Sequence, residues 1–283
     1  MTDISSLKPG PIGVFDSGYG GLTILSEIKK VMPEYDLLYL GDNARAPYGN
    51  RSPELIYEFT LEAVKWLFSK GCQLVIIACN TASARALRKI QQNDLPQIDP
   101  FKRVLGVIRP TAENVVEITH TKHIAILATE ATIRSKSYER EIDRLQQNIT
   151  ISTEACPMWV PLVENKEYNK EGADYFVKQH LDRVLQKDKE IDTIILGCTH
   201  YPLLLNKIKQ YTPKHVTLFS QGEYVANSLR KYLDRHQSMD LMCSKKGEQL
   251  YCTTESAERF ENLASFLLDK TISAKKIDLR TKE

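Results

Sequence analysis

The stretch QLVIIACNTASARALRKI, residues 73–90, joins a buried strand to a helix through a short polar turn. Residues 73–78 are mostly apolar and rich in β-branched side chains, a pattern that predicts a strand inside a sheet. The same order, an apolar strand and then a cysteine among polar residues, recurs in TIILGCTHYP, residues 193–202. The chain therefore places a thiol twice at the point where a buried strand ends.

Strands and amphipathic helices alternate along the rest of the chain. Residues 55–67 carry apolar side chains at a helical period, and Ser52 and Pro53 before them are suited to cap and start that helix. Strands that alternate with helices are joined by right-handed crossovers and form mainly parallel sheets. The other predicted strands are residues 11–17, 36–42, 103–108, 123–129, 193–197 and 215–222, with a last strand and helix within 248–268.

No low-complexity linker separates the two halves of the chain, and the alternation restarts after the turn-rich residues 93–101. We therefore predict an α/β fold of two similar doubly wound lobes, whose mainly parallel sheets face each other across an active-site cleft. The first lobe is expected to comprise residues 1–103 and 214–283, and the second residues 104–213. The C-terminal segment is assigned to the first lobe because its strand, within 215–222, has no evident place in the second.

Composition narrows the class of protein. The 283 residues are 42% hydrophobic and 26% charged, and 38 basic and 36 acidic residues are well mixed, so neither a nucleic-acid groove nor a membrane face is indicated. No apolar run approaches the ~18 residues that a membrane span needs. The start, MTDISSLKPG, lacks the basic and apolar segments of a signal peptide. We therefore expect a cytoplasmic protein, in which the six cysteines do not form a disulfide framework.

Polar residues follow several predicted strands. In open α/β sheets, ligands bind beyond the carboxyl ends of the strands, so these residues are candidates for a site. Hydroxyl and amide groups next to backbone N–H donors are suited to bind carboxylates, which suggests a small dicarboxylic amino acid without saying which. The candidates are Asp16, Ser17, Gly18, Tyr48, Gly49, Cys79, Asn80, Thr81, Thr129, Thr132, Cys198, Thr199 and His200.

Three other interpretations fit less well. The DSGYGG turn lacks the glycine spacing of a dinucleotide-binding loop, and Asp16 would repel a pyrophosphate. Zinc could use Cys79, Cys198 and His200, but no fourth ligand stands out, so no metal is predicted. Two core cysteines without a function would leave the neighbouring polar side chains buried without partners.

The remaining interpretation uses both thiols. If each lobe contributes one cysteine, a bound molecule has sulfur on either side, which is the arrangement that inverts a carbon stereocentre. A thiolate removes the proton from one face, and a thiol returns one to the other. A thiol of ordinary pKa, ~8.5, is mostly protonated at neutral pH and needs a partner. His200 could tune Cys198 or be a structural histidine, and Asp16 could assist Cys79 or cap its own turn.

Five stretches resemble glutamate racemase, a family of cofactor-independent isomerases within the aspartate/glutamate racemase superfamily. They are GVFDSGYGGLTIL (13–25), LGDNARAPYG (40–49), ACNTASA (78–84), CPMWVPLVE (156–164) and LGCTHYPLL (196–204). The resemblance implies interconversion of L- and D-glutamate without a cofactor, a supply of D-glutamate for peptidoglycan, and a homodimer. It also implies the two-lobed fold with C-terminal residues returning to the first lobe.

The resemblance also assigns roles to residues of this chain. Cys79 and Cys198 would exchange the proton, Asp16 and His200 would assist them, and Glu164 would support the His200 side or be an ordinary surface glutamate. The implied substrate contacts are Asp16, Ser17, Tyr48, Gly49, Asn80, Thr81, Thr199 and His200, with Thr132 as a further contact.

One segment departs from the family pattern. Many relatives carry an Asp-Ser pair after the late strand, where this chain has FSQGE, residues 219–223, so the role of that segment stays open. Two rival functions also stay open: racemisation of a related amino acid such as aspartate, and a non-catalytic amino-acid-binding module.

Overall fold

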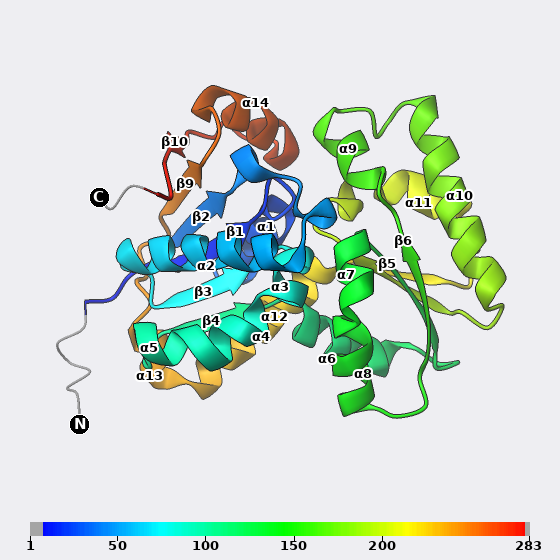
Figure 1. Cartoon of the computed structure of the whole chain (residues 1–283), viewed down its shortest axis with the longest axis horizontal. Coiled ribbons are helices and arrows are strands. Elements are labelled where there is room, and N and C mark those ends of the chain that lie inside the picture. Colours follow the sequence, from blue (N-terminus) through cyan, green and yellow to red (C-terminus); the bar gives the residue numbers. More distant parts are fainter. Residues whose placement is uncertain (1–7, 281–283) are drawn as a thin grey trace.

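The computed structural model describes residues 8–280, and within them the strands form two sheets in which every pairing is parallel. The larger sheet has the order β10-β9-β2-β1-β3-β4 and the smaller one β6-β5-β7-β8. Figure 1 shows the two sheets in neighbouring lobes, with the β3 arrow pointing toward the second lobe. The predicted α/β fold with two parallel sheets is confirmed.

The larger sheet comprises β1 (Ile12–Asp16), β2 (Leu37–Gly41), β3 (Leu74–Ile77), β4 (Arg103–Gly106), β9 (Gln249–Thr253) and β10 (Lys275–Lys276). The smaller sheet comprises β5 (His123–Ala128), β6 (Thr150–Ala155), β7 (Thr193–Gly197) and β8 (Thr217–Phe219). The α-helices in the described part of the chain are α1 (Leu22–Val31), α2 (Pro53–Ser69), α3 (Asn80–Arg85), α4 (Leu87–Lys89), α5 (Leu95–Ile98), α6 (Ile108–Ile118), α7 (Glu130–Ser135), α8 (Ser137–Leu145), α9 (Trp159–Glu164), α10 (Glu171–Lys187), α11 (Leu205–Tyr211), α12 (Gln221–Arg235), α13 (Gln237–Leu241) and α14 (Ala257–Leu268).

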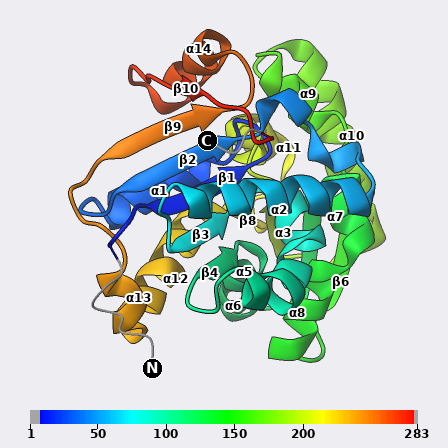
Figure 2. The ribbon, with the colours of Figure 1, turned by 60° about the vertical axis from the view of Figure 1, so that its left-hand side comes forward.

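Helices cover both faces of each sheet, because alternate residues of a strand point to opposite faces. Ile12 and Val14 of β1 pack with α1 and α12, whereas Phe15 packs with α2 on the other face. In the smaller sheet, Ile124 of β5 packs with α6 and α8, whereas Leu127 packs with α10. Figures 1 and 2 show these helical layers from two directions. Strands that are buried on both faces read as the nearly continuous apolar runs seen in the sequence.

The helix start predicted at Ser52 is confirmed. Its hydroxyl accepts a hydrogen bond from the Leu55 N–H at 3.4 Å, and Pro53 is the first helical residue. Gly71 lies just beyond the end of this helix with a φ of +92°, a conformation that favours glycine.

Two strands belong to the opposite sheet from the one predicted. Residues 103–108 were expected mostly in the second lobe, but β4 pairs with β3 in the larger sheet. Residues 215–222 were expected in the first lobe, but β8 pairs with β7 in the smaller sheet. A single helical crossover leads from β3 to β4 and another from β7 to β8, so each of these later strands pairs with the strand before it. The chain therefore changes sheet after Gly106 and again after Phe219, and β9 and β10 then extend the larger sheet beside β2.

The edge strand β6 was not predicted from the sequence. Its residues, TISTEA, are half-buried or exposed, and only Ile151 and Ala155 are apolar. Such a strand lacks the apolar run that revealed its neighbours. None of the helices within residues 8–280 combines the length and the apolar character that crossing a bilayer requires. Residues 1–7, which hold most of the stretch considered for a signal peptide, lie outside the described residues.

Asp192 joins the amino end of β7 to the loop that precedes β5. Its carboxylate accepts four hydrogen bonds of 2.6–2.8 Å, from the Thr119 and Thr193 hydroxyls and the His120 and Thr121 N–H groups. Partial burial raises the pKa of Asp192, but these hydrogen bonds outweigh burial and lower it from 3.8 to about 2. A carboxylate held in this way stabilises the folded state.

We predict that Asp192→Asn lowers the free energy of unfolding at pH 7 by about 2 kcal/mol, the equivalent of the pKa shift. Because the folded pKa lies below the unfolded value, this stabilisation is present above pH ~4 and is lost as the pH falls toward ~2. Urea titrations at pH 7 and pH 3 measure it, and the difference between variant and wild type should shrink at pH 3. Asp182→Asn, in an exposed pair with Lys178, is the control and should change little.

Candidate active site

Cys79 lies in the turn between β3 and α3. Its sulfur caps α3 by accepting a hydrogen bond from the Ala82 N–H at 3.5 Å, and it lies 3.3 Å from the Ser17 hydroxyl oxygen. Only 5% of the residue is exposed. Burial raises the pKa of Cys79 to about 12, and the nearby Asp16 adds to the rise. This sulfur is therefore a neutral thiol at physiological pH.

Cys198 follows β7 and has the opposite electrostatic surroundings. Its sulfur lies 3.8 Å from Nδ1 of His200, whose Nε2 is 3.1 Å from a carboxylate oxygen of Glu164. Burial by itself lowers the pKa of His200, but the contacts with Cys198 and Glu164 outweigh it and raise that pKa well above its usual value. The His200 imidazole thus stands between a sulfur and a carboxylate, and the raised pKa favours its cationic form.

Asp16, at the end of β1, connects the two cysteine loops. Its fully buried carboxylate accepts hydrogen bonds from the Gly18 N–H at 2.9 Å and from the Thr199 hydroxyl at 3.2 Å. Burial raises its pKa, although the His200 charge and these hydrogen bonds act in the other direction. Ser17, the next residue, contacts Cys79, and Thr199 is adjacent to Cys198. The turn after β1 therefore contacts the loop after β7 through Asp16 and the loop after β3 through Ser17.

The glycine-rich turn after β1 permits this close approach. A Cβ atom on Gly20 would lie 2.3 Å from the Thr199 hydroxyl oxygen and 2.5 Å from Nδ1 of His200. One on Gly21 would lie 2.4 Å from Cβ of Asp16. No side chain fits at those distances, so the turn needs glycine for space, as close backbone approaches do.

A cluster of hydroxyl groups joins the lobes beside the thiols. The Thr81 hydroxyl oxygen lies 2.9 Å from that of Thr129 and 3.4 Å from that of Thr132. Gly49 packs against the same place, since a Cβ there would lie 3.0 Å from Thr129. The structure thus brings Gly49, Thr81, Thr129 and Thr132 together, as the sequence predicts for residues at strand ends.

The side chains of Tyr48 and Asn80 are engaged elsewhere. The Tyr48 hydroxyl donates to Asp42 at 2.5 Å, and the Asn80 amide bonds to Tyr138 and Gln221. The polar atoms of these two side chains are therefore hydrogen-bonded to other protein groups.

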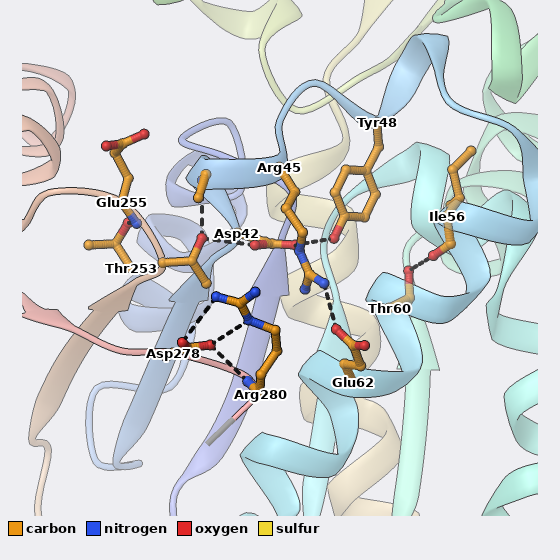
Figure 3. A network of polar contacts seen from close by, with 12 residues as sticks. Asp42, Arg45, Tyr48, Ile56, Thr60, Glu62, Thr253, Glu255, Asp278 and Arg280 are labelled. Carbon is orange, nitrogen blue, oxygen red and sulfur yellow. Dashed lines mark hydrogen bonds and ion pairs between the residues drawn. The ribbon is translucent and has the colours of Figure 1, made fainter. Parts of the chain in front are cut away.

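Asp42 anchors the loop that carries Tyr48 and Gly49, as Figure 3 shows. Besides Tyr48, its carboxylate accepts from Arg45 Nε at 2.7 Å and from the Thr254 hydroxyl at 2.8 Å. Arg45 in turn donates to Glu62 at 2.5 Å. Asp42 was not among the candidate residues, although it follows β2 and the strand-end rule could have found it. Gln221 belongs to the segment 219–223, whose role the sequence left open.

One cavity lies apart from the two buried thiols. A cavity of about 1000 Å³ lies between α4, α6, α8 and α12, where Arg88, Arg109 and Arg140 are among its lining residues, and neither Cys79 nor Cys198 reaches it. Each of these arginines bonds to a protein group, to Glu141, to Glu113 and to Ser137 with Ser135 respectively.

Comparison with known proteins places this geometry in a family. Residues 23–227 match the model of the Asp/Glu/Hydantoin racemase family. The chain is 40% identical over 272 residues to a glutamate racemase of a Ruegeria species, a match that covers 93% of this chain and 98% of that protein. A glutamate racemase of Persephonella marina is 39% identical over 95% of this chain and 97% of its own. The chain belongs to the Asp/Glu/Hydantoin racemase family.

Solved structures agree with this assignment. The glutamate racemase of Bacillus anthracis superimposes with a TM-score of 0.88 at 35% identity and covers 96% of this chain and 99% of its own. That of Francisella tularensis, in complex with D-glutamate, has a TM-score of 0.85 at 29% identity and covers 96% of this chain and 98% of its own. An aspartate racemase of Picrophilus torridus, at 18% identity and a TM-score of 0.52, shares the fold alone.

We predict that Gly20→Ala reduces racemase turnover by roughly a hundred-fold, because a displaced Thr199–His200 segment misplaces Cys198. Steady-state kinetics with the purified variant measure it. Gly172→Ala, at a helical position with open space around it, is the matched control and should keep wild-type activity. A Gly20→Ala variant with unchanged kcat and KM would contradict the close approach.

Proposed function

We propose that this isomerase interconverts L-glutamate and D-glutamate by a two-thiol mechanism that uses no cofactor. One observation carries the mechanism: the turn after β1 contacts both cysteine loops, that of Cys198 through Asp16 and Thr199 and that of Cys79 through Ser17. Each loop belongs to one of the two parallel sheets, so a small molecule held between the sheets has one sulfur on each side. The relatives named glutamate racemase support glutamate as the substrate.

The two sulfurs have complementary surroundings for proton transfer. Cys198, beside the His200 cation, serves as the base that removes the α-proton from one face. Cys79, a thiol whose pKa burial raises to about 12, then gives its proton to the opposite face of the carbanion. In the reverse direction the roles exchange, and Asp16, whose pKa burial also raises, assists the proton movement on the Cys79 side.

The substrate contacts belong to the same proposal. Ser17, Thr81 and Thr199 offer hydroxyl groups, and the α3 amino end and the Gly49 backbone offer N–H donors to the carboxylates. Cys79 is 5% exposed and Cys198 6%, so the lobes must separate for glutamate to enter. The Francisella tularensis structure with bound D-glutamate supports a small-molecule ligand of this type.

We further propose that the D-glutamate supplies peptidoglycan synthesis, and that the enzyme acts in the cytoplasm as a homodimer. The structure of Escherichia coli glutamate racemase with L-glutamate and the activator UDP-MurNAc-ala, at 26% identity and a TM-score of 0.73, supports the link to muramyl nucleotides. Location and assembly stay predictions from the sequence.

We expect Cys79→Ala and Cys198→Ala each to lose racemisation by at least a thousand-fold, because each removes one of the two proton carriers. The enzyme is incubated with chelator and L- or D-glutamate in D₂O, and optical rotation and deuterium at the α-carbon are followed. Cys72→Ala is the matched control, because Cys72 is also buried but precedes the amino end of β3, whereas Cys79 follows the carboxyl end. It should retain activity.

Different failures of this experiment point to different conclusions. Absence of α-deuterium uptake by the wild-type enzyme, with saturable glutamate binding, would favour the non-catalytic binding module. Faster exchange of aspartate than of glutamate in a competition would favour the related racemase. Full activity in either cysteine variant would refute the role of that thiol.

We expect Glu164→Gln to shift the alkaline limb of kcat/KM to lower pH. Contact with Glu164 helps to raise the pKa of His200, so without that negative charge the imidazole loses its proton at a lower pH. The cation is present below the pKa of His200 and is lost as the pH rises through it. A pH–rate profile measures the shift, and Glu167→Gln, in an exposed pair with Lys170, is the control. An unmoved alkaline limb would assign Glu164 to the surface.

A further inference from the structure

Gln221 lies where the chain leaves the smaller sheet. It is the first residue of α12, two positions after the end of β8, in the FSQGE segment, residues 219–223. Its side chain is polar and its exposed fraction is 2%. A buried amide of this kind must be matched with hydrogen-bond partners, and each partner constrains where it points.

The partners of Gln221 form one closed network. Its Nε2 donates to the Thr111 hydroxyl at 2.7 Å and to the Tyr138 hydroxyl at 2.6 Å, and its Oε1 accepts from Asn80 Nδ2 at 2.7 Å. The Tyr138 hydroxyl donates to Asn80 Oδ1 at 2.5 Å. The Thr111 hydroxyl donates to the Val107 carbonyl at 2.7 Å, so it can only accept from Gln221.

The direction of every hydrogen bond is therefore fixed. Thr111 requires a donor, which orients the Gln221 amide and turns its oxygen toward Asn80. Asn80 must then present its NH₂ group to Gln221 and its oxygen to Tyr138. Burial raises the pKa of Tyr138, so its hydroxyl remains a donor. The network thus selects one of the two orientations of the Asn80 amide.

The network joins four helices around the site. Asn80 follows Cys79 directly and begins α3, whereas Tyr138 belongs to α8 of the second lobe. Thr111 in α6 and Gln221 in α12 mark the two places where the chain crosses between the sheets. Both crossings are thereby bonded to each other and to the residue after the thiol.

We propose that Gln221 is a positioning residue that acts through Asn80 and sets the first turn of α3, and with it Cys79, relative to the second lobe. The proposal rests on the proposed racemase function. Gln221 takes no part in proton transfer. Its carboxamide supplies the donor and the acceptor that the Asn80 orientation needs.

The test compares two variants of the full chain in the glutamate racemisation assay. Gln221→Met keeps the size but removes the hydrogen bonds, and kcat/KM should fall by roughly ten- to a hundred-fold, the cost of a small misplacement. The same change in an Asn80→Ala background should cost nothing more, because the route through Asn80 is already lost. The proposal would be overturned if Gln221→Met lowered kcat/KM by the same factor in the Asn80→Ala background as in wild type. It would also be overturned if Gln221→Met alone kept kcat/KM within about twofold of wild type.

Gln221→Glu adds a readout that a merely structural role would not produce. A carboxylate cannot donate to Thr111 or Tyr138, whereas a neutral carboxyl group keeps one donor and one acceptor. Burial raises the pKa of such a group, so the activity of the variant relative to wild type should increase as the pH falls. A ratio that stays constant with pH would overturn the proposal.

The controls separate failure of this proposal from failure of the proposed function. Gln73→Glu introduces the same chemical change at a buried glutamine that directly precedes the amino end of β3. The pH dependence of its activity should match that of wild type. If wild type itself does not exchange the α-proton, the racemase function fails. If Gln221→Met does not fold, Tyr138→Phe, which removes one hydroxyl from the same network, should show the loss and its dependence on Asn80.

Discussion

The hydrogen bond from the Thr199 hydroxyl to Asp16 is the contact on which the site depends. A fully buried carboxylate must be matched by donors, and here one of the donors comes from the other sheet. The carboxylate thus draws together the loop that carries Cys198 and the turn whose Ser17 contacts Cys79. Gly20 leaves the space for this approach, because any side chain there would collide with Thr199 and His200. Function and folding share this one interaction.

The two thiols differ in electrostatic surroundings because their neighbouring loops place different charged groups beside them. Cys79 is buried beside Asp16, and both burial and that carboxyl group favour its neutral form. Cys198 lies beside a histidine whose cation is maintained by Glu164. The two thiols therefore differ in the charged groups around them, as the acid and the base of the proposed mechanism require.

The sequence predicted the fold and the central residues because both depend on local patterns. Buried parallel strands are continuous apolar runs, and polar residues at their ends, such as Asp16 and Cys79, are visible without a structure. Pairing between strands is not local, which is why β4 and β8 were assigned to the wrong sheet. The polar edge strand β6 carries no apolar run at all. Likewise, the sequence around Asn80 does not indicate that its amide bonds to Gln221, 141 residues away.

Buried polar contacts join the lobes at three places: Asp16 with Thr199, Thr81 with Thr129, and Asn80 with Tyr138. Apolar surfaces can slide over one another at little cost, but hydrogen bonds lose strength within fractions of an ångström and with small changes of angle. Each contact therefore fixes direction as well as distance. The proposed mechanism places a proton carrier at each face of one carbon atom, and such directional contacts restrict how the two lobes are arranged. The separation of the lobes proposed for substrate entry would break these hydrogen bonds, so they would add to its free-energy cost.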